Sequence, residues 1–279
     1  MRTFNPYPPA TPRGGARFGR TLLRTLRTLR TLLLATATAA AAAALTLTLA
    51  GCDQPAPPPE PTPAERPAVP GADEARDQLA ARVAAAGDRR VTAQYLLATA
   101  GAADRWVTVT EAADGGWRVD VAGGALSGNA DISVARTADG LFQCALQSAG
   151  RPDPPVCVRV ADPDGVLPAP LDPEVEHVFT DWRQALLDRA EPLAVGASRP
   201  LPGAAGSCYS VDSTSAALAP PVAEGIYCYE PDGTLTAARL KLGSLRLVGA
   251  PAAAPATVTL PAPVVAADPL PITAPTLPT

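Results

Sequence analysis

The sequence predicts an α+β domain in which an antiparallel β-sheet packs against two helices. Short segments rich in β-branched and aromatic residues alternate in polarity and are joined by turns that contain glycine, a pattern typical of antiparallel strands. Two segments have apolar residues at helical spacing. One precedes the first strand, and the other lies in the middle of the series of strands. Many strands with so few helices favour one sheet with the helices laid against it.

The first half of the domain is predicted to be a helix followed by a meander of strands. The helix covers residues 73–86, where Leu79 and Val83 share a face because they are four residues apart. The Asp-Gly-Gly turn at residues 114–116, between two alternating segments, is a hairpin signature. Six strands are predicted after the helix: residues 91–99, 106–110, 117–121, 131–137, 141–146 and 156–160.

The second half is predicted to be another helix and a second set of strands. Asp172 caps this helix, Pro173 occupies its first position and Glu174 lies in its first turn. An apolar stripe at helical spacing consists of Val175, Val178, Phe179, Trp182 and Leu186. An Asp-Gly turn at residues 232–233 separates two of the later strands. These strands are expected at residues 207–211, 225–229, 235–242, 245–248 and, last, 257–260.

Four cysteines predict two disulfides, because an even set in an exported chain is typical of an oxidising compartment. Three pairings are possible. We favour Cys144–Cys157 and Cys208–Cys228, since each pair flanks a loop containing Pro or Gly between two apolar segments. Metal binding is the alternative, but these cysteines have no Cys-x-x-Cys spacing and the chain has one histidine.

The N-terminal segment has the layout of a secretory signal. Seven arginines and no acidic residue precede Cys52, and an uncharged stretch rich in Ala, Leu and Thr covers residues 31–50. The small residues Ala50 and Gly51 stand directly before Cys52. This box, residues 49–52, resembles the cleavage site of bacterial lipoproteins. An uncleaved membrane-spanning helix is the alternative, but Ala and Thr make the stretch weakly apolar and prolines follow it.

The lipoprotein resemblance implies that Cys52 becomes the first mature residue and carries lipid (diacylglycerol and palmitate). The protein is then expected to be tethered to the extracytoplasmic face of the cell membrane. Four segments are predicted: a signal peptide (1–51), a Pro-rich linker (52–71), the disulfide-stapled domain (72–260) and a Pro/Ala-rich disordered tail (261–279).

Without the signal segment the chain is acidic. The full chain has 23 basic and 27 acidic residues, and removal of seven arginines leaves 16 basic against 27 acidic residues, a net charge of −11. Such a surface repels phosphate backbones, so nucleic acid is not expected as a partner. Anionic headgroups are repelled too, which leaves the lipid as the membrane attachment. Abundant Arg, Ala and Pro, with Lys241 as the only lysine, are typical of GC-rich genomes such as those of actinobacteria.

No catalytic residue, cofactor or metal site is expected. His177 is the only histidine and, without a Gly-x-Ser-x-Gly motif, it is interpreted as a solvated helix residue. Residues 162–165 faintly resemble a calcium loop but lack its later glutamate, so they are predicted to form a turn. Several aromatic residues are interpreted as packing around the core or a disulfide, with a speculative binding face as the alternative; they are Tyr209, Tyr227, Tyr229 and Trp182.

The order of elements over residues 73–250 resembles LolA-type lipoprotein carriers and related lipid-binding lipoproteins. The resemblance implies a curved, half-barrel-like sheet that holds acyl chains between itself and the helices. The chain departs from that family by its cysteine pairs, its Pro-rich arms and its few bulky aliphatic residues. The expected function is a membrane-anchored, non-catalytic binding domain for a lipid or another envelope component. A structural or protein-interaction module of the envelope, with no small-molecule ligand, is the alternative.

Overall fold

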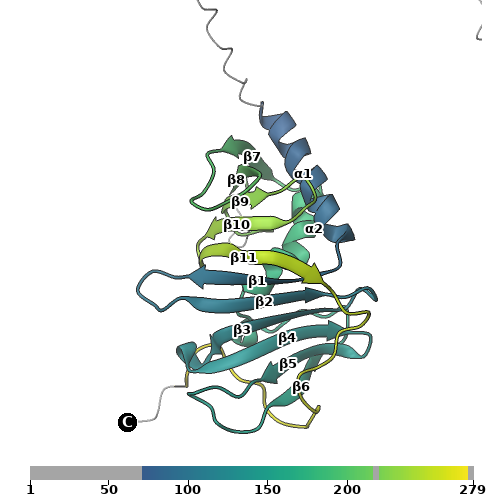
Figure 1. Cartoon of the computed structure of the whole chain (residues 1–279), viewed down its shortest axis with the longest axis vertical. Helices are drawn as coiled ribbons and strands as arrows, with labels where there is room; N and C mark the ends of the chain where they lie inside the picture. Colours follow the sequence, from purple (N-terminus) through teal and green to yellow (C-terminus); the bar gives the residue numbers. More distant parts are fainter. Residues whose placement is uncertain (1–70, 216–219, 276–279) are drawn as a thin grey trace, which may run out of the picture. The chain divides into compact units, whose positions relative to one another are not determined.

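The computed structural model describes residues 71–215 and 220–275 (Figure 1). All of these residues belong to one unit of the chain. The predicted signal peptide (1–51), the predicted lipidation site Cys52 and all of the predicted linker except Gly71 lie outside the described residues.

The domain is built on one open, curved sheet, and the predicted α+β class is confirmed. The sheet has eleven antiparallel strands in the order β6-β5-β4-β3-β2-β1-β11-β10-β9-β8-β7, so β6 and β7 form its edges. The strands are β1 (Val91–Ala98), β2 (Arg105–Glu111), β3 (Trp117–Ala125), β4 (Ala130–Thr137), β5 (Gly140–Ala145), β6 (Val156–Ala161), β7 (Leu193–Ser198), β8 (Ser207–Ser213), β9 (Gly225–Tyr229), β10 (Leu235–Leu240) and β11 (Gly243–Ala253).

The sheet consists of two meanders that meet at its centre. Strands β1 to β6 pair in chain order outward to one edge, and β7 to β11 pair in chain order from the other edge inward. The last strand then pairs with the first, with Tyr95 of β1 opposite Leu247 of β11. Figure 1 shows these two strands side by side in the middle of the sheet.

The first helix, α1 (Ala72–Asp88), confirms the predicted apolar face. Its first turn contains Asp73 and Glu74, which interact favourably with the positive end of the helix dipole. Leu79 and Val83 are fully buried in the main core. The helix contacts α2 (Asp181–Leu187), β7 and β9, so it covers the β7–β9 half of one sheet face (Figure 1).

The prediction of one long helix that begins at Asp172 is wrong, because this segment does not form a continuous helix. The structure has two short pieces, the 3-10 turn η3 (Val175–Phe179) and the seven-residue α2, separated by a break at Thr180 (φ −124°, ψ −111°). The Thr180 hydroxyl donates a hydrogen bond to the carbonyl of Glu176 and contacts the Asp181 carboxylate, and such local bonds compete with helical ones. The apolar stripe is nevertheless buried, except for the half-buried Trp182. Two further 3-10 turns are η1 (Leu126–Gly128) and η2 (Ala169–Leu171).

Two strand predictions also differ from the structure. Strand β7 was not predicted, because Leu-Ala-Val-Gly-Ala-Ser has little of the β-branched and aromatic content that identifies strands. Residues 257–260 were expected to form a strand, but they have no strand pairing. Prolines at 255 and 261 flank this segment and remove donors that a sheet ladder needs.

The described part of the C-terminal tail, residues 254–275, is held against strands β3 to β6. We call this segment the C-terminal strap. Residues 261–275 are therefore not disordered as expected, and the rest of the predicted tail, residues 276–279, lies outside the described residues. The Cys157 amide donates to the carbonyl of Pro263, and the amide of Val265 donates back to Cys157. The buried Gln143 side chain makes two hydrogen bonds to the backbone of Leu270, at 2.9 and 2.7 Å. Proline prevents regular structure here but leaves these carbonyls free to accept.

Both predicted disulfides, Cys144–Cys157 and Cys208–Cys228, are present. Each joins two residues directly opposite each other on neighbouring strands, β5 with β6 and β8 with β9. The bridges therefore fasten strand pairs near the two edges of the sheet. Such bonds are typical of extracytoplasmic proteins, and the structure is consistent with that location.

Candidate functional site

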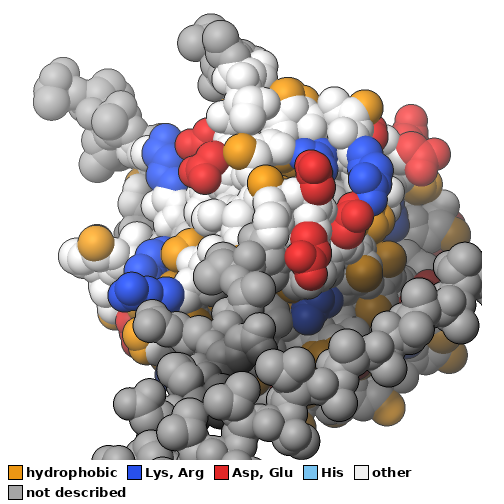
Figure 2. Space-filling view, turned by 90° about the horizontal axis from the view of Figure 1, so that it is seen from above, with side chains coloured by type: hydrophobic (Ala, Val, Ile, Leu, Met, Phe, Trp, Pro, Cys, Tyr) orange, Lys and Arg blue, Asp and Glu red, His pale blue; other side chains and the backbone are white. Residues whose placement is uncertain are grey.

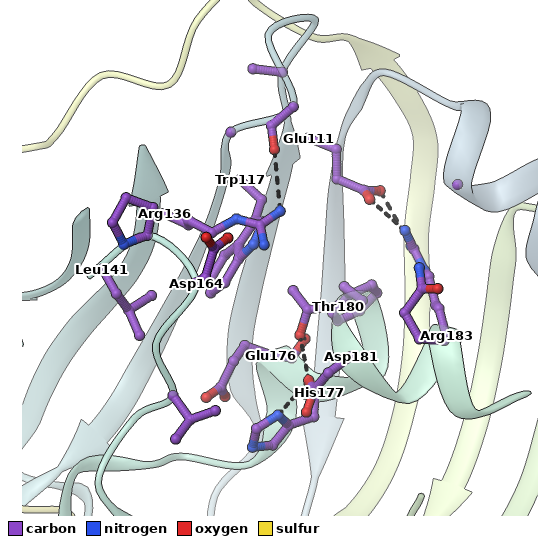
Figure 3. Close-up of a pocket in the computed structure, with 18 of the residues that line it drawn as sticks. Glu111, Trp117, Arg136, Leu141, Asp164, Glu176, His177, Thr180, Asp181 and Arg183 are labelled. Carbon is purple, nitrogen blue, oxygen red and sulfur yellow. Dashed lines mark hydrogen bonds and ion pairs between the residues drawn. The ribbon is translucent and has the colours of Figure 1, made fainter. Parts of the chain in front are cut away.

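A cavity of about 540 Å³ lies between the sheet and the segment that carries η3 and α2 (Figure 3). Its walls come from the β2–β3 hairpin, strands β4 and β5, the loop 163–167 and the end of α1. Apolar residues such as Trp117, Leu141 and Phe179 alternate there with charged ones such as Arg136 and Glu176. A cavity of this size suits a small molecule.

One wall of the cavity contains an ion pair between Glu111 on β2 and Arg183 on α2. The two side chains meet through two contacts, one of them 3.2 Å between Arg183 Nη2 and Glu111 Oε2. Arg183 is 8% exposed. Burial opposes its charge, but the Glu111 carboxylate outweighs burial and raises the pKa of Arg183. The pair attaches the short α2 to the sheet, and the Nε of Arg183 has no hydrogen-bond partner.

A second wall combines Trp117 on β3 with Arg136 on β4. The Arg136 guanidinium lies 5.8 Å from the centroid of the Trp117 ring, within the range of a cation–π contact. Arg136 also donates to the carbonyl of Gly115 at 3.4 Å. The indole Nε1 of Trp117 is buried without a partner. This wall thus offers an aromatic face and a cation, together with one unused donor.

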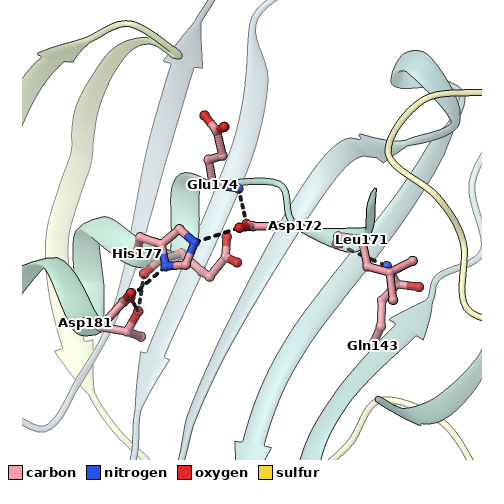
Figure 4. Close-up of polar contacts among 8 residues, drawn as sticks. Gln143, Leu171, Asp172, Glu174, His177 and Asp181 are labelled. Atoms are coloured by element: carbon pink, nitrogen blue, oxygen red, sulfur yellow. Dashed lines mark hydrogen bonds and ion pairs between the residues drawn. The ribbon is translucent and has the colours of Figure 1, made fainter. Parts of the chain in front are cut away.

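His177 is held between two carboxylates, which corrects its interpretation as a solvated residue (Figure 4). Its Nε2 lies 2.8 Å from Asp172 Oδ2 and its Nδ1 lies 2.6 Å from Asp181 Oδ1. Burial by itself lowers the pKa of His177, but the hydrogen bonds to Asp172 and Asp181 raise it to about 10. For both aspartates, burial opposes the charge, while the bond to His177 holds their pKa below the usual value.

Glu176, next to His177 in the chain, is the most unusual residue of the site. It is 2% exposed, and neither of its carboxyl oxygens is bonded to an N–H or O–H donor of residues 71–215 or 220–275 in the hydrogen-bond network of the structure. Burial, followed by the negative charge of Asp172, raises the pKa of Glu176 well above its usual value. Asp172 lies close by, and the contact between the two carboxyl groups also raises the pKa of Glu176. A buried carboxyl group without partners is costly and rare in proteins.

The speculative aromatic binding face is not part of this cavity. Tyr209, Tyr227 and Tyr229 are at most 1% exposed and pack in the main core, so the packing interpretation holds. They lie on the opposite side of their strands from the disulfide Cys208–Cys228, as strand alternation requires. Trp182 does not line the cavity, but it stacks on the His177 ring with 5.4 Å between the ring centroids and so packs against this residue of the site.

The sequence interpretation missed the charged residues that line the cavity, although part of the signal was present. The only histidine has acidic residues five and one positions before it and four positions after it, at Asp172, Glu176 and Asp181. The turn predicted at residues 162–165 is present, since the Gly165 amide donates to the Asp162 carbonyl. Asp164 of that turn lies at the cavity.

The face of the molecule in Figure 2 is mixed in charge. Figure 2 shows acidic and basic side chains next to each other, with hydrophobic side chains in small groups between them. This face therefore has no extended patch of one sign among the residues it shows. Within residues 71–215 and 220–275, no helix is long and apolar enough to span a membrane.

Comparison with known proteins finds no family model that matches the chain and no similar curated protein.

Proposed function

We propose that the protein is a non-catalytic binding protein of the cell envelope, tethered by lipid at Cys52, whose cavity takes an amphiphilic envelope molecule such as a lipid. The observation that carries this proposal is the lining of the cavity, where unpaired polar atoms stand beside apolar walls. Binding sites for small molecules combine a largely apolar surface with a few polar groups that fix orientation.

The lining indicates how such a ligand would lie. Its apolar body would rest on Trp117, Leu141 and Phe179. Its polar group would lie near Trp117 Nε1 and Arg183 Nε, two buried donors that have no hydrogen-bond partner among the described residues. The guanidinium of Arg136 adds a positive charge beside the indole. An oxygen-rich headgroup on an apolar tail fits this combination.

The curved sheet and the signal box support the same setting. The half-barrel-like carriers that the chain resembles in element order hold acyl chains between sheet and helices, and the cavity here lies between the sheet and the segment that carries η3 and α2. Charged side chains make this cavity more polar than a site for acyl chains alone. The proposed ligand is therefore an amphiphile rather than a simple hydrocarbon.

Native mass spectrometry of the full-chain protein, purified from bacterial membranes in detergent, tests the proposal. Spectra are recorded before and after organic extraction. A covalent lipid at Cys52 survives extraction, whereas a ligand in the cavity is removed. We expect an adduct that disappears on extraction.

Trp117→Phe and Trp106→Phe provide a matched pair. Trp106 is 49% exposed on neighbouring β2 and does not line the cavity. Trp117→Phe removes the unpaired indole donor, so we expect it to reduce the adduct several-fold, while Trp106→Phe leaves it unchanged. Identical masses before and after extraction in the unmodified protein would contradict the proposal and favour the protein-interaction alternative.

A further inference from the structure

We propose that Asp172, Glu176 and His177 form a site for a divalent first-row transition-metal ion, of the zinc class, at the wall of the cavity. The donors are one oxygen from each carboxylate and Nε2 of the imidazole. One nitrogen and two carboxylate oxygens form a donor set that such ions prefer. The inference does not depend on the amphiphilic ligand proposed above.

The three donor atoms are already gathered. They lie within 4.8 Å of one another. Two ligands of the same ion, each at about 2.1 Å from it, are separated by at most about 4.2 Å. In a tetrahedral shell two such ligands are about 3.4 Å apart, so side-chain movements on the order of 1 Å bring the donors around an ion. The segment supplies all three donors locally, so no distant part of the chain has to move.

Glu176 gives an independent reason to place a ligand here. It is 2% exposed and both of its carboxyl oxygens lack an N–H or O–H donor among the described residues. Its neighbours Asp172 and His177 do have partners, since they bond to each other. A buried carboxylate is stable when it is paired or coordinates a metal. A cation between the three side chains would satisfy Glu176 and replace the bond between Asp172 and His177.

The orientation of the imidazole is also that of a metal ligand. Asp181 Oδ1 lies 2.6 Å from Nδ1 of His177, and the Thr180 hydroxyl in turn holds Asp181 at 2.9 Å. This fixes the ring so that Nε2 is turned towards Asp172 (Figure 4). Histidines that bind metals commonly have a carboxylate on the other ring nitrogen, which orients the ring and raises its basicity.

The site would keep an open coordination position. Glu176 and His177 also line the cavity, whereas Asp172 does not. An ion bound to all three residues is therefore approached from the cavity side, where water or an oxygen of a ligand can complete its shell. Three protein ligands with an open fourth position are characteristic of zinc sites that bind exchangeable groups.

Zinc titration of the full-chain protein, first treated with a chelator, tests this inference. Because the chain has one histidine, all imidazole signals in a ¹H–¹⁵N correlation spectrum belong to His177. We expect one equivalent of zinc to shift the Nε2 resonance and the chelator to reverse the shift. Unchanged imidazole signals in excess zinc would overturn the proposal.

Glu176→Gln and Glu174→Gln form the matched pair of variants. Gln has the shape of a protonated Glu, so Glu176→Gln preserves packing and removes only the ability to provide a carboxylate. We expect it to weaken zinc binding by more than about tenfold, the effect typical of losing even an outer-shell partner. Glu174 is exposed and two residues away, and Glu174→Gln should bind zinc as the unmodified protein does. Equal zinc affinity of the two variants would overturn the assignment of Glu176 as a ligand.

Discussion

His177 shows why one of its partners could be predicted from the sequence and the other could not. Residues four apart on a helix share a face, so the spacing favours the contact of His177 with Asp181, which is kept although the helix is broken at Thr180. Asp172 is five residues before His177, and on a continuous helix the two would point about 140° apart. They meet only because the predicted helix does not form over residues 172–174, where the Asp172 carboxylate instead accepts the amide of Glu174.

The first prediction concerns the charge of His177 in the metal-free protein. Its pKa is about 10 in the folded state, against 6.5 for a free imidazole. A raised pKa contributes stability that is complete below pH 6.5 and is lost as the pH rises towards 10. With chelator present, we expect the imidazole signals in NMR spectra to stay those of the charged ring through pH 8.

Urea unfolding at several pH values provides the complementary measurement. The free energy of unfolding should fall between pH 6.5 and pH 10, and His177→Gln should reduce that fall, while the raised pKa of Glu176 acts in the same direction in both proteins. The pKa values of Asp172 and Asp181 are lowered, so their contribution to the free energy of unfolding is lost only in acid. It therefore does not change between pH 6.5 and pH 10. An imidazole that titrates near pH 6.5 in the folded protein would contradict the prediction.

At the scale of elements, the predictable parts were those with local causes. Alternating polarity and Asp-Gly turns located ten of the eleven strands, and the i, i+4 pattern located α1. Strand β7 was missed because Gly196 and its alanines pair in the sheet through tertiary contacts rather than propensity. The break at Thr180 depends on side-chain hydrogen bonds within the segment, which an apolar stripe does not encode.

The second prediction compares the Asp-Gly turns at Gly233 and Gly115. Both glycines have φ of +85°, so alanine is strained at either position. A Cβ at Gly233 would lie 2.1 Å from the backbone nitrogen of Ala86 in α1, whereas one at Gly115 meets nothing within 4 Å. We expect Gly115→Ala to cost about 1–2 kcal/mol of unfolding free energy, and Gly233→Ala to cost about 3 kcal/mol or more because the turn must also move away from α1.

Urea denaturation of both variants checks this ordering. Gly115→Ala is the control for backbone strain, so the difference between the two variants reports the contact of the β9–β10 turn with α1. A loss of stability that is the same in both would show that the turn and the helix do not press on each other.

At the scale of the whole molecule, the arrangement of the two meanders and the strap could not be predicted from the sequence. The local patterns give the strands of each meander, but the pairing of β1 with β11 joins segments about 150 residues apart. Composition predicted a disordered tail, because Pro, Ala and Thr provide little surface to bury. The strap is ordered instead by pairs of hydrogen bonds to Gln143 and to Cys157, and by the packing of Leu260 and Ala262 against the disulfide between β5 and β6.

The last prediction tests whether the strap is part of the folded domain. Gln143 is 2% exposed, and its amide pairs with both backbone groups of Leu270. Gln143→Ala leaves these groups without partners, so we expect it to lower the free energy of unfolding by about 1–3 kcal/mol. Gln147 is the control: it is exposed and makes one hydrogen bond, to Pro152, and Gln147→Ala should change stability by no more than about 0.5 kcal/mol.

Hydrogen exchange then locates the loss, because the Val265 and Leu270 amides should exchange faster in Gln143→Ala than in Gln147→Ala. Equal stability and equal exchange in the two variants would mean that the tail contributes nothing to the domain, as its composition alone suggests.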